Sequence, residues 1–369
     1  MQQIKILSVF FLFLGISGIL LGCGDETRDS TPAVQEITVT DNAGRSITLP
    51  HPVTRAAVAN RYNMEVIQSL GVLDRVCGVD YGIYQDRNAY GEFAEDQVIG
   101  TNQRTLNYER IIELHPEVLI LPDNGAWEDA EKKLSPFGIK VIVMNPYYTD
   151  HFEELYRLAG TVFGREQEAD AFIRYFKEKL DYIETQLAGV PRKRVYYEYK
   201  KPGWTTVPGD YFYKMVELAG GDNIFSDAVN TNVDIEAVVE RNPAAIIKVG
   251  EDGAAPQWQA PGAAELAARK QRLIDRPGWD HIRAVQDDNI LIMSQYVQGG
   301  AAKIIGTLYI AKFLYPEQLP DLHPEDVFRH WVERYQHKEY QPGHTLPAFP
   351  LTGECRQTGG SMPGAGKSD

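Results

Sequence analysis

The feature that most constrains the fold is a pattern of twelve residues that occurs twice. Residues 109–120 and 236–247 both read Glu-x-φ-φ-Glu-x-x-Pro-x-x-φ-Ile, where φ is aliphatic. In each copy the apolar spacing predicts a short amphipathic helix that ends near its proline and leads into an apolar strand. The copies begin 127 residues apart, at Glu109 and Glu236, which is about the length of one domain. The chain is therefore predicted to contain two halves built to one plan.

Strands and helices alternate around both copies. A helical segment with Met64, Ile67 and Leu70 on one face precedes Gly71, and a second helical segment, Met215–Ala219, precedes Gly220. This alternation predicts an α/β fold of two Rossmann-like lobes with mostly parallel sheets. The predicted strands lie at residues 56–59, 76–79, 118–121 and 141–144 in the first half, and at 194–197, 245–249 and 290–293 in the second.

The segment between the halves lacks proline and has apolar residues at helical spacing. We predict a single long interdomain helix at residues 149–189, with an N-terminal lobe at 36–148 and a C-terminal lobe at 190–340. A continuous helix of about 38 residues would span about 57 Å and join the lobes as a stiff rod. Gly160 and Gly164 are positions where it would kink. The alternative is two ordinary helices within one domain.

The N-terminus has the features of a secretion signal. Lys5 is followed by an apolar run that ends Leu-Leu-Gly-Cys at Cys23. A small residue before a cysteine resembles the bacterial lipobox, in which the cysteine is lipidated and becomes the new N-terminus. We predict a signal peptide at 1–22, a lipidated tether at 23–35 and a lipid-anchored protein outside the cytoplasm. The alternatives are a simple signal peptide with an incidental cysteine, or an uncleaved membrane anchor.

Composition and charge limit the classes of partner and of site that this sequence is expected to have. The formal net charge of −14 disfavours nucleic acid as a partner. Residues 341–369, rich in Pro, Gly and Ser, are predicted to be disordered. A disulfide between Cys77 and Cys355 stays open, with a buried inert thiol as the simpler interpretation of Cys77. The eight histidines are scattered, which disfavours a free-metal site, and the sequence has no motif for a cofactor or for catalysis.

Several short motifs, in this order and spacing, resemble the binding proteins of ferric-siderophore, haem and vitamin B12 ABC importers. The resemblance covers residues 38–335 and implies a monomer of two lobes joined by one helix. It also implies that Glu109 and Glu236, one on each lobe, pair with arginines of the permease dimer. The alternative is that each glutamate only complements a helix dipole. The motifs are Thr40-Asp41-Asn42-Ala43-Gly44-Arg45 with Leu49-Pro50, Leu70-Gly71 with Asp74-Arg75-Val76, Asn107-Tyr108-Glu109, residues 218–224, and residues 308–312 with Tyr315-Pro316.

The ligand is expected in the cleft where the carboxyl ends of the strands of both lobes meet. Aromatic side chains there suit a bulky chelate or ring system, and arginines suit a negatively charged ligand. Each aromatic residue has ordinary packing as its alternative. The candidate residues, all from loops after predicted strands, are Arg61, Tyr62, Tyr81, Tyr84, Arg104, Trp127, Trp204 and Tyr296.

The function expected from the sequence is capture of a metal complex of the ferric-siderophore type and its delivery to an ABC permease. A corrinoid, haem and an oxyanion such as molybdate follow as alternative ligands, in that order. An exported enzyme and a lipoprotein that presents its ligand to a sensor are the alternatives from other functional classes.

Overall fold

The computed structural model describes residues 35–250 and 258–352. The predicted signal peptide, Cys23, most of the tether and Cys355 lie outside the described residues. Cys77 is buried in strand β4. Within residues 35–250 and 258–352, no helix combines the length and the apolar composition that a membrane span requires.

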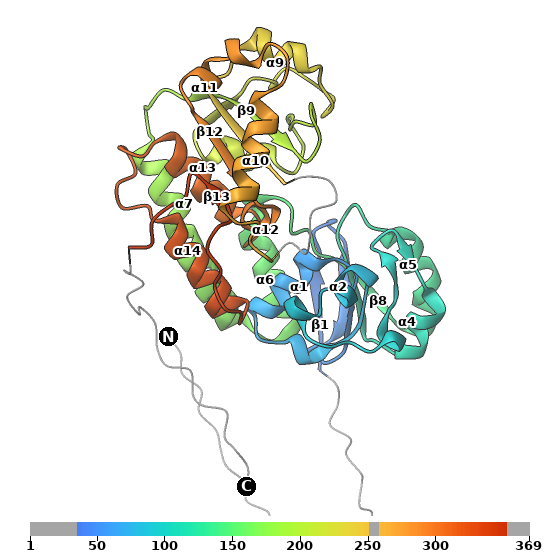
Figure 1. The fold of residues 1–369 in the computed structure, drawn as a ribbon. Helices are drawn as coiled ribbons and strands as arrows, with labels where there is room; N and C mark the ends of the chain where they lie inside the picture. The colour runs from blue at the N-terminus through green and yellow to red at the C-terminus, as the bar shows by residue number, and fades with distance from the viewer. Residues whose placement is uncertain (1–34, 251–257, 353–369) are drawn as a thin grey trace, which may run out of the picture. The chain divides into compact units, whose positions relative to one another are not determined.

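The N-terminal lobe is built on a parallel sheet with the strand order β4-β3-β7-β8. Helix α5 packs on β8 at the outer side of this sheet (Figure 1). The four strands are almost entirely buried, which explains their continuous apolar runs. The elements of this lobe are β1 (Glu36–Thr40), β2 (Ser46–Pro50), β3 (Ala56–Val58), α1 (Arg61–Ser69), β4 (Val76–Val79), α2 (Tyr81–Gln85), α3 (Arg87–Tyr90), β5 (Gly100–Asn102), β6 (Thr105–Leu106), α4 (Tyr108–Leu114), β7 (Val118–Leu121), α5 (Trp127–Leu134) and β8 (Lys140–Val143).

The C-terminal lobe repeats the plan with the strand order β10-β9-β11-β12-β13. Its first four strands are parallel, and β13 is antiparallel to β12. Helix α10 packs on β12 and β13 (Figure 1). The elements are β9 (Lys193–Tyr199), α8 (Tyr213–Leu218), β10 (Gly221–Asn223), α9 (Ile235–Arg241), β11 (Ala245–Val249), α10 (Ala263–Ile274), α11 (Arg283–Gln286), β12 (Ile290–Met293), α12 (Gln295–Gly299), α13 (Ile304–Leu314), α14 (Pro324–His330) and β13 (Thr345–Leu346).

The repeated pattern forms the same structure in both lobes. Asn107 and Asp234 cap helices α4 and α9 with their side chains, and both helices have seven residues. Each helix ends on a left-handed residue, His115 or Asn242, directly before the proline. The strands that follow, β7 and β11, are the third in the order of their sheets. The prediction of two lobes with mostly parallel sheets is confirmed.

The prediction of one continuous helix at 149–189 is wrong. The chain forms α6 (Phe152–Phe163) and α7 (Glu166–Gln186), separated by Gly164 in a left-handed conformation with φ of 61°. The two helices pack on each other because their apolar faces match, and the rings of Tyr156 and Phe172 stack at 3.7 Å. Helix α6 packs on the N-terminal lobe, whereas α7 contacts α8 and α13 of the C-terminal lobe. The helix that joins the lobes is therefore α7, with 21 residues.

The predicted disorder of residues 341–369 is also wrong for residues 341–352, and residues 353–369 lie outside the described part. Strand β13 pairs with β12, and the buried His344 lies 2.7 Å from the Ser294 hydroxyl. Phe349 packs edge-on against Tyr309. These residues lack apolar periodicity because each contacts the lobe individually, so a periodicity argument misses them.

A second link between the lobes runs beside α7. Helix α14 lies along α7 (Figure 1), where His330 packs on Tyr175 at 4.5 Å. A π-helical turn, Trp331–Tyr335, follows. Gln336 then donates to the Glu65 carbonyl (3.1 Å) and to the Ser69 hydroxyl (2.9 Å) of α1 in the N-terminal lobe. The lobes are thus held on one side by two packed segments.

Candidate ligand site between the lobes

The strands of both sheets end at the junction of the lobes. Asn60, directly after β3, caps α1 by accepting hydrogen bonds from the backbone N–H groups of Tyr62 and Asn63. Its amide nitrogen also donates to the hydroxyl of Tyr147, which follows β8, at 2.8 Å. One asparagine thereby fixes the two loops that carry Arg61, Tyr62 and Tyr147 to this junction.

Aromatic rings from both lobes meet there, and we call them the cleft cluster: Tyr62, Tyr147 and Tyr148 from the N-terminal lobe, and Tyr199, Tyr211 and Phe212 from the C-terminal lobe. The ring centre of Tyr147 lies 5.8 Å from that of Tyr62 and, across the junction, 4.7 Å from that of Tyr211. The ring centres of Phe212 and Tyr199 are also 4.7 Å apart. Tyr62 also rests on Gly299 of α12, where a Cβ atom would lie only 2.7 Å from the ring. The cluster gives the junction wide, stiff walls with polar edges.

Arg61 begins α1 beside this cluster. Its guanidinium lies 5.0 Å from the centre of the Tyr62 ring and donates to the Tyr62 hydroxyl at 3.4 Å. Burial lowers the pKa of Arg61, but Tyr62, Tyr90 and Glu65 raise it above its usual value, so the side chain stays charged. Burial raises the pKa of Glu65 well above its usual range, against the opposing effect of Arg61 and Lys338.

Lys303 enters the cluster from the turn before α13. Its side chain is 1% exposed, and Nζ lies 4.8 Å from the ring centre of Tyr147 and 5.5 Å from those of Tyr62 and Phe212. Nζ has no hydrogen-bond partner among the described residues. Burial lowers the pKa of Lys303 to about 7, although Asp210 and Glu65 raise it.

The backbone that carries Lys303 is unusual. Ala301, Ala302 and Lys303 all have positive φ values, of 51°, 54° and 66°. A left-handed conformation costs a residue with a side chain about 1–2 kcal/mol, and such outliers concentrate at functional sites. The run brings Lys303 into the junction at the start of a buried apolar helix.

Three of the predicted ligand residues belong to this junction. Arg61 and Tyr62 lie in it, and Trp204 is at its edge, 5.0 Å from Tyr199. Trp127 instead packs within the N-terminal lobe, where Arg45 covers its ring at 4.5 Å and its Nε1 donates to the Asp123 carbonyl. The carboxylate of the same Asp123 accepts a hydrogen bond from the Tyr211 hydroxyl of the junction at 3.5 Å.

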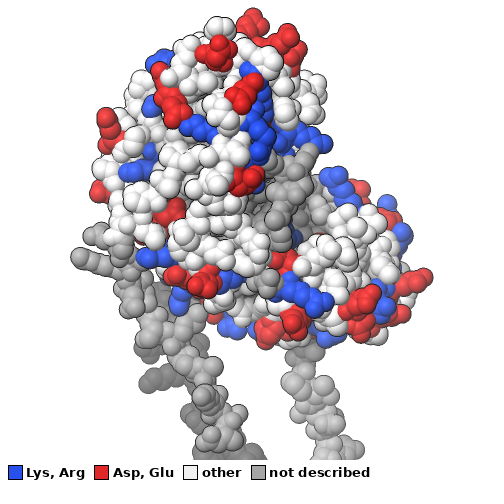
Figure 2. Space-filling view, viewed as in Figure 1, with Lys and Arg blue, Asp and Glu red and all other residues white. Residues whose placement is uncertain are grey.

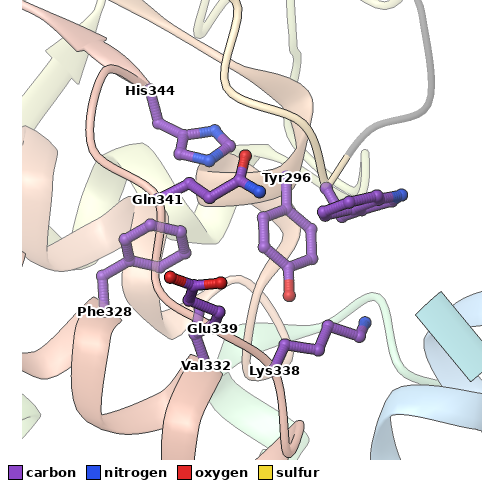
Figure 3. Close-up of a pocket in the computed structure, with 8 residues that line it drawn as sticks. Tyr296, Phe328, Val332, Lys338, Glu339, Gln341 and His344 are labelled. Atoms are coloured by element: carbon purple, nitrogen blue, oxygen red, sulfur yellow. The ribbon is translucent and has the colours of Figure 1, made fainter. Parts of the chain in front are cut away.

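The other predicted residues are not brought to the cluster. Tyr81 is 45% exposed and pairs with Tyr84 on α2. Arg104 is exposed and donates to the Asn124 carbonyl at 2.9 Å. Tyr296 is buried in a separate small pocket of about 10 Å³ with Phe328 and His344 (Figure 3), which has room for about one water molecule.

Sequence reasoning missed Tyr147, Tyr211, Phe212 and Lys303. A signal existed for two of them. Tyr147 follows a predicted strand, as Tyr62 does, and Lys303 is a single cation within the apolar run 301–311. Nothing in the sequence indicates that Tyr211 and Phe212, ten or more residues after β9, return to the junction.

The repeated glutamates have equivalent, exposed positions. Glu109 and Glu236 each lie in the first turn of their helix, α4 and α9. Neither carboxylate forms a hydrogen bond or ion pair with another residue in the described ranges. Glu113, one turn after Glu109, instead pairs with Arg110 at 2.7 Å. Figure 2 shows acidic and basic side chains interspersed over both lobes on the face drawn.

Comparison with known proteins agrees with this architecture. The sequence profile described as "Periplasmic binding protein" matches residues 57–297, more than half of the chain. The chain belongs to the periplasmic binding protein family. It is thus a substrate-binding protein of the type that serves ABC importers outside the cytoplasm.

Three similar proteins illustrate how far this periplasmic binding protein has diverged. It is 22% identical to the molybdate-binding protein MolA of Haemophilus influenzae, over 85% of this chain and 94% of the relative. It is 24% identical to an uncharacterized ABC transporter substrate-binding lipoprotein, YvrC, of Bacillus subtilis, over 81% and 94%. The crystal structure of the TroA-like periplasmic binding protein FepB from Veillonella parvula superposes with a TM-score of 0.70 at 19% identity, over 84% and 99%.

Proposed function

We propose that this periplasmic binding protein is a lipid-anchored carrier that holds its ligand between the lobes and delivers it to the permease of an ABC importer. The observation that carries the proposal is the contact of Tyr62, whose hydroxyl accepts from Arg61, with Gly299 and Lys303 across the junction. Separating the lobes would expose these side chains together. The ligand leaves chemically unchanged, which distinguishes the carrier from an exported enzyme.

Two ligand classes have specific support. The first is a metal complex of the ferric-siderophore type, which suits the aromatic walls and the charged Arg61. The second is molybdate, because the relative MolA is named a molybdate-binding protein. The direct contact of Tyr147 with Tyr211 favours a compact ligand of this size, because a bulky chelate requires the lobes to separate further.

Delivery is proposed to depend on Glu109 and Glu236. Two exposed carboxylates at equivalent positions of the two lobes form a two-point contact for a dimeric permease. Ion pairs with permease arginines would set the orientation and speed the encounter. Cys23 is proposed as the lipidated residue that keeps the protein at the membrane.

The docking proposal is tested by reversing both charges, Glu109→Lys with Glu236→Lys. The matched control is Glu113→Lys with Glu240→Lys, one turn later on the same helices. We expect the first pair to abolish ligand uptake by cells and retention of the permease in a pulldown, while ligand affinity stays unchanged. The control pair should retain most uptake. Equal loss in both pairs, or retention of a membrane receptor in place of the permease, would contradict the assignment.

A further inference from the structure

The strongest unexplained feature of the junction is the chemical state of Lys303. Its ammonium offers three N–H donors, yet Nζ contacts only the faces of Tyr147, Tyr62 and Phe212 and has no hydrogen-bond acceptor among the described residues. A buried cation without an acceptor is costly for a folded protein.

The same lobe shows how this chain holds a lysine that has a structural role. Lys248 is 3% exposed, and its Nζ forms an ion pair with Glu198 at 3.0 Å and donates to the Lys200 carbonyl at 2.6 Å. Lys303 is buried to the same degree without either type of partner. The missing partner is therefore a property of this site and not of buried lysines in this protein.

The surroundings of Lys303 are arranged for a partner that comes from outside. The aromatic rings around its Nζ come from both lobes, Tyr62 and Tyr147 from one and Phe212 from the other. Separation of the lobes would therefore open a path to Nζ. Arg61, the half-buried second cation of the junction, lies against Tyr62, so both cations face the same ring. Two cations directed at one aromatic wall suit a ligand that carries negative charge on oxygen atoms.

We propose that Lys303 binds the ligand directly and that the ligand is an anion with oxygen acceptors, either a compact oxyanion or an anionic oxygen-ligated iron chelate. This inference rests on the proposed carrier function and narrows its ligand class. A corrinoid without net negative charge does not meet the requirement.

The proposal is tested first without any ligand. Lys303→Met removes an unpartnered buried cation, so thermal denaturation at pH 6 should show a Tm about 2–5 °C above the wild type. The matched control, Lys248→Met, leaves Glu198 without its lysine and should lower Tm by several degrees. A Tm of Lys303→Met that falls as in the control would show that Lys303 is structural and would overturn the proposal.

The second test is calorimetric titration of the full-length protein with three probes: molybdate, the ferric complex of 2,3-dihydroxybenzoate, and cyanocobalamin. We expect the wild type to bind one of the two anions, and Lys303→Met to bind it at least tenfold more weakly. Lys303→Arg should recover part of the loss. Equal affinity in wild type and Lys303→Met overturns the role of Lys303.

The two proposals fail in different ways. Binding of cyanocobalamin alone overturns the anionic ligand while the carrier function stands. Failure of the wild type to bind any of the three probes, together with no permease retained in a pulldown, counts against the carrier function itself.

Discussion

Two groups of buried charges in this protein differ in whether their charged atoms have hydrogen-bond partners. In the core of the C-terminal lobe, Glu198 accepts hydrogen bonds from Arg276 at 2.7 and 2.8 Å and pairs with Lys248 at 3.0 Å. At the junction of the lobes, Lys303 is as deeply buried, but its ammonium lies among aromatic rings and has no hydrogen-bond acceptor in the described residues. The first group is complete within one lobe, and the second is incomplete in the described structure.

We infer from this difference that the first group stabilises its lobe and that the second group serves ligand binding. A satisfied charge network fixes one arrangement of its lobe, whereas an unsatisfied one lowers stability and raises affinity for a partner that completes it. If the comparison is valid, substitutions in the two groups will have effects of opposite sign on stability.

The largest effect is expected from Glu198→Gln in the complete group. The change leaves the buried Lys248 and the partly buried Arg276 without their carboxylate, so we expect a loss of about 3–5 kcal/mol in the free energy of unfolding. Urea denaturation measures it. Glu265→Gln, on a carboxylate that is 44% exposed, serves as the control and should change stability little. A loss for Glu198→Gln as small as that of the control would break the comparison.

A smaller effect is expected where Tyr62 rests on the C-terminal lobe. Gly299→Ala places a Cβ 2.7 Å from the Tyr62 ring, and such overpacking costs about 1–3 kcal/mol. In a Tyr62→Ala background the same change should cost almost nothing, because the ring is gone. A double-mutant cycle measured by urea denaturation gives the coupling, and additive effects would show that the contact does not form in solution.

The most specific effect is the pH dependence of the incomplete group. The pKa of Lys303 falls from 10.5 to about 7 on folding, so between these values the unfolded state binds more protons and stability rises with pH. The stability that Lys303→Met gains over the wild type should therefore be largest below pH 7 and shrink toward pH 10.5. The charged and titratable groups that face Lys303 are Glu65, Asp210, Tyr62 and Tyr147.

Denaturation of both proteins at pH 6 and pH 9 gives this difference, and an equal gap at both values would contradict it. Because anion binding requires the protonated lysine, affinity for the anion should fall as pH rises above 7, by at most about tenfold per unit from this group.

The sequence predicted most of the architecture because local periodicity encodes it. The repeated pattern around Glu109 and Glu236 defines a helix, a left-handed cap and a buried strand, and all of these depend on neighbours within a few residues. The long-helix prediction failed at Gly164, because a glycine in a helical pattern permits either a kink within one helix or a turn between two helices. Packing of Tyr156 on Phe172 decided between them.

The junction was predictable only in part because it depends on long-range contacts. Arg61 and Tyr62 follow a strand directly, so strand order places them there. Tyr211 and Phe212 reach Tyr147 and Tyr199 through a loop that no periodicity describes. The position of Lys303 depends on the left-handed backbone of residues 301–303. The alanines at 301 and 302 give no indication in the sequence of this conformation.

The most direct test of the claim that ligand is held between the lobes is hydrogen–deuterium exchange, with and without whichever of the three probes binds. We expect slower exchange at amides of both lobes, in residues 60–63 and 145–148 of one and residues 210–213 and 299–304 of the other. Slower exchange confined to one lobe, or located away from these four segments, would contradict the account.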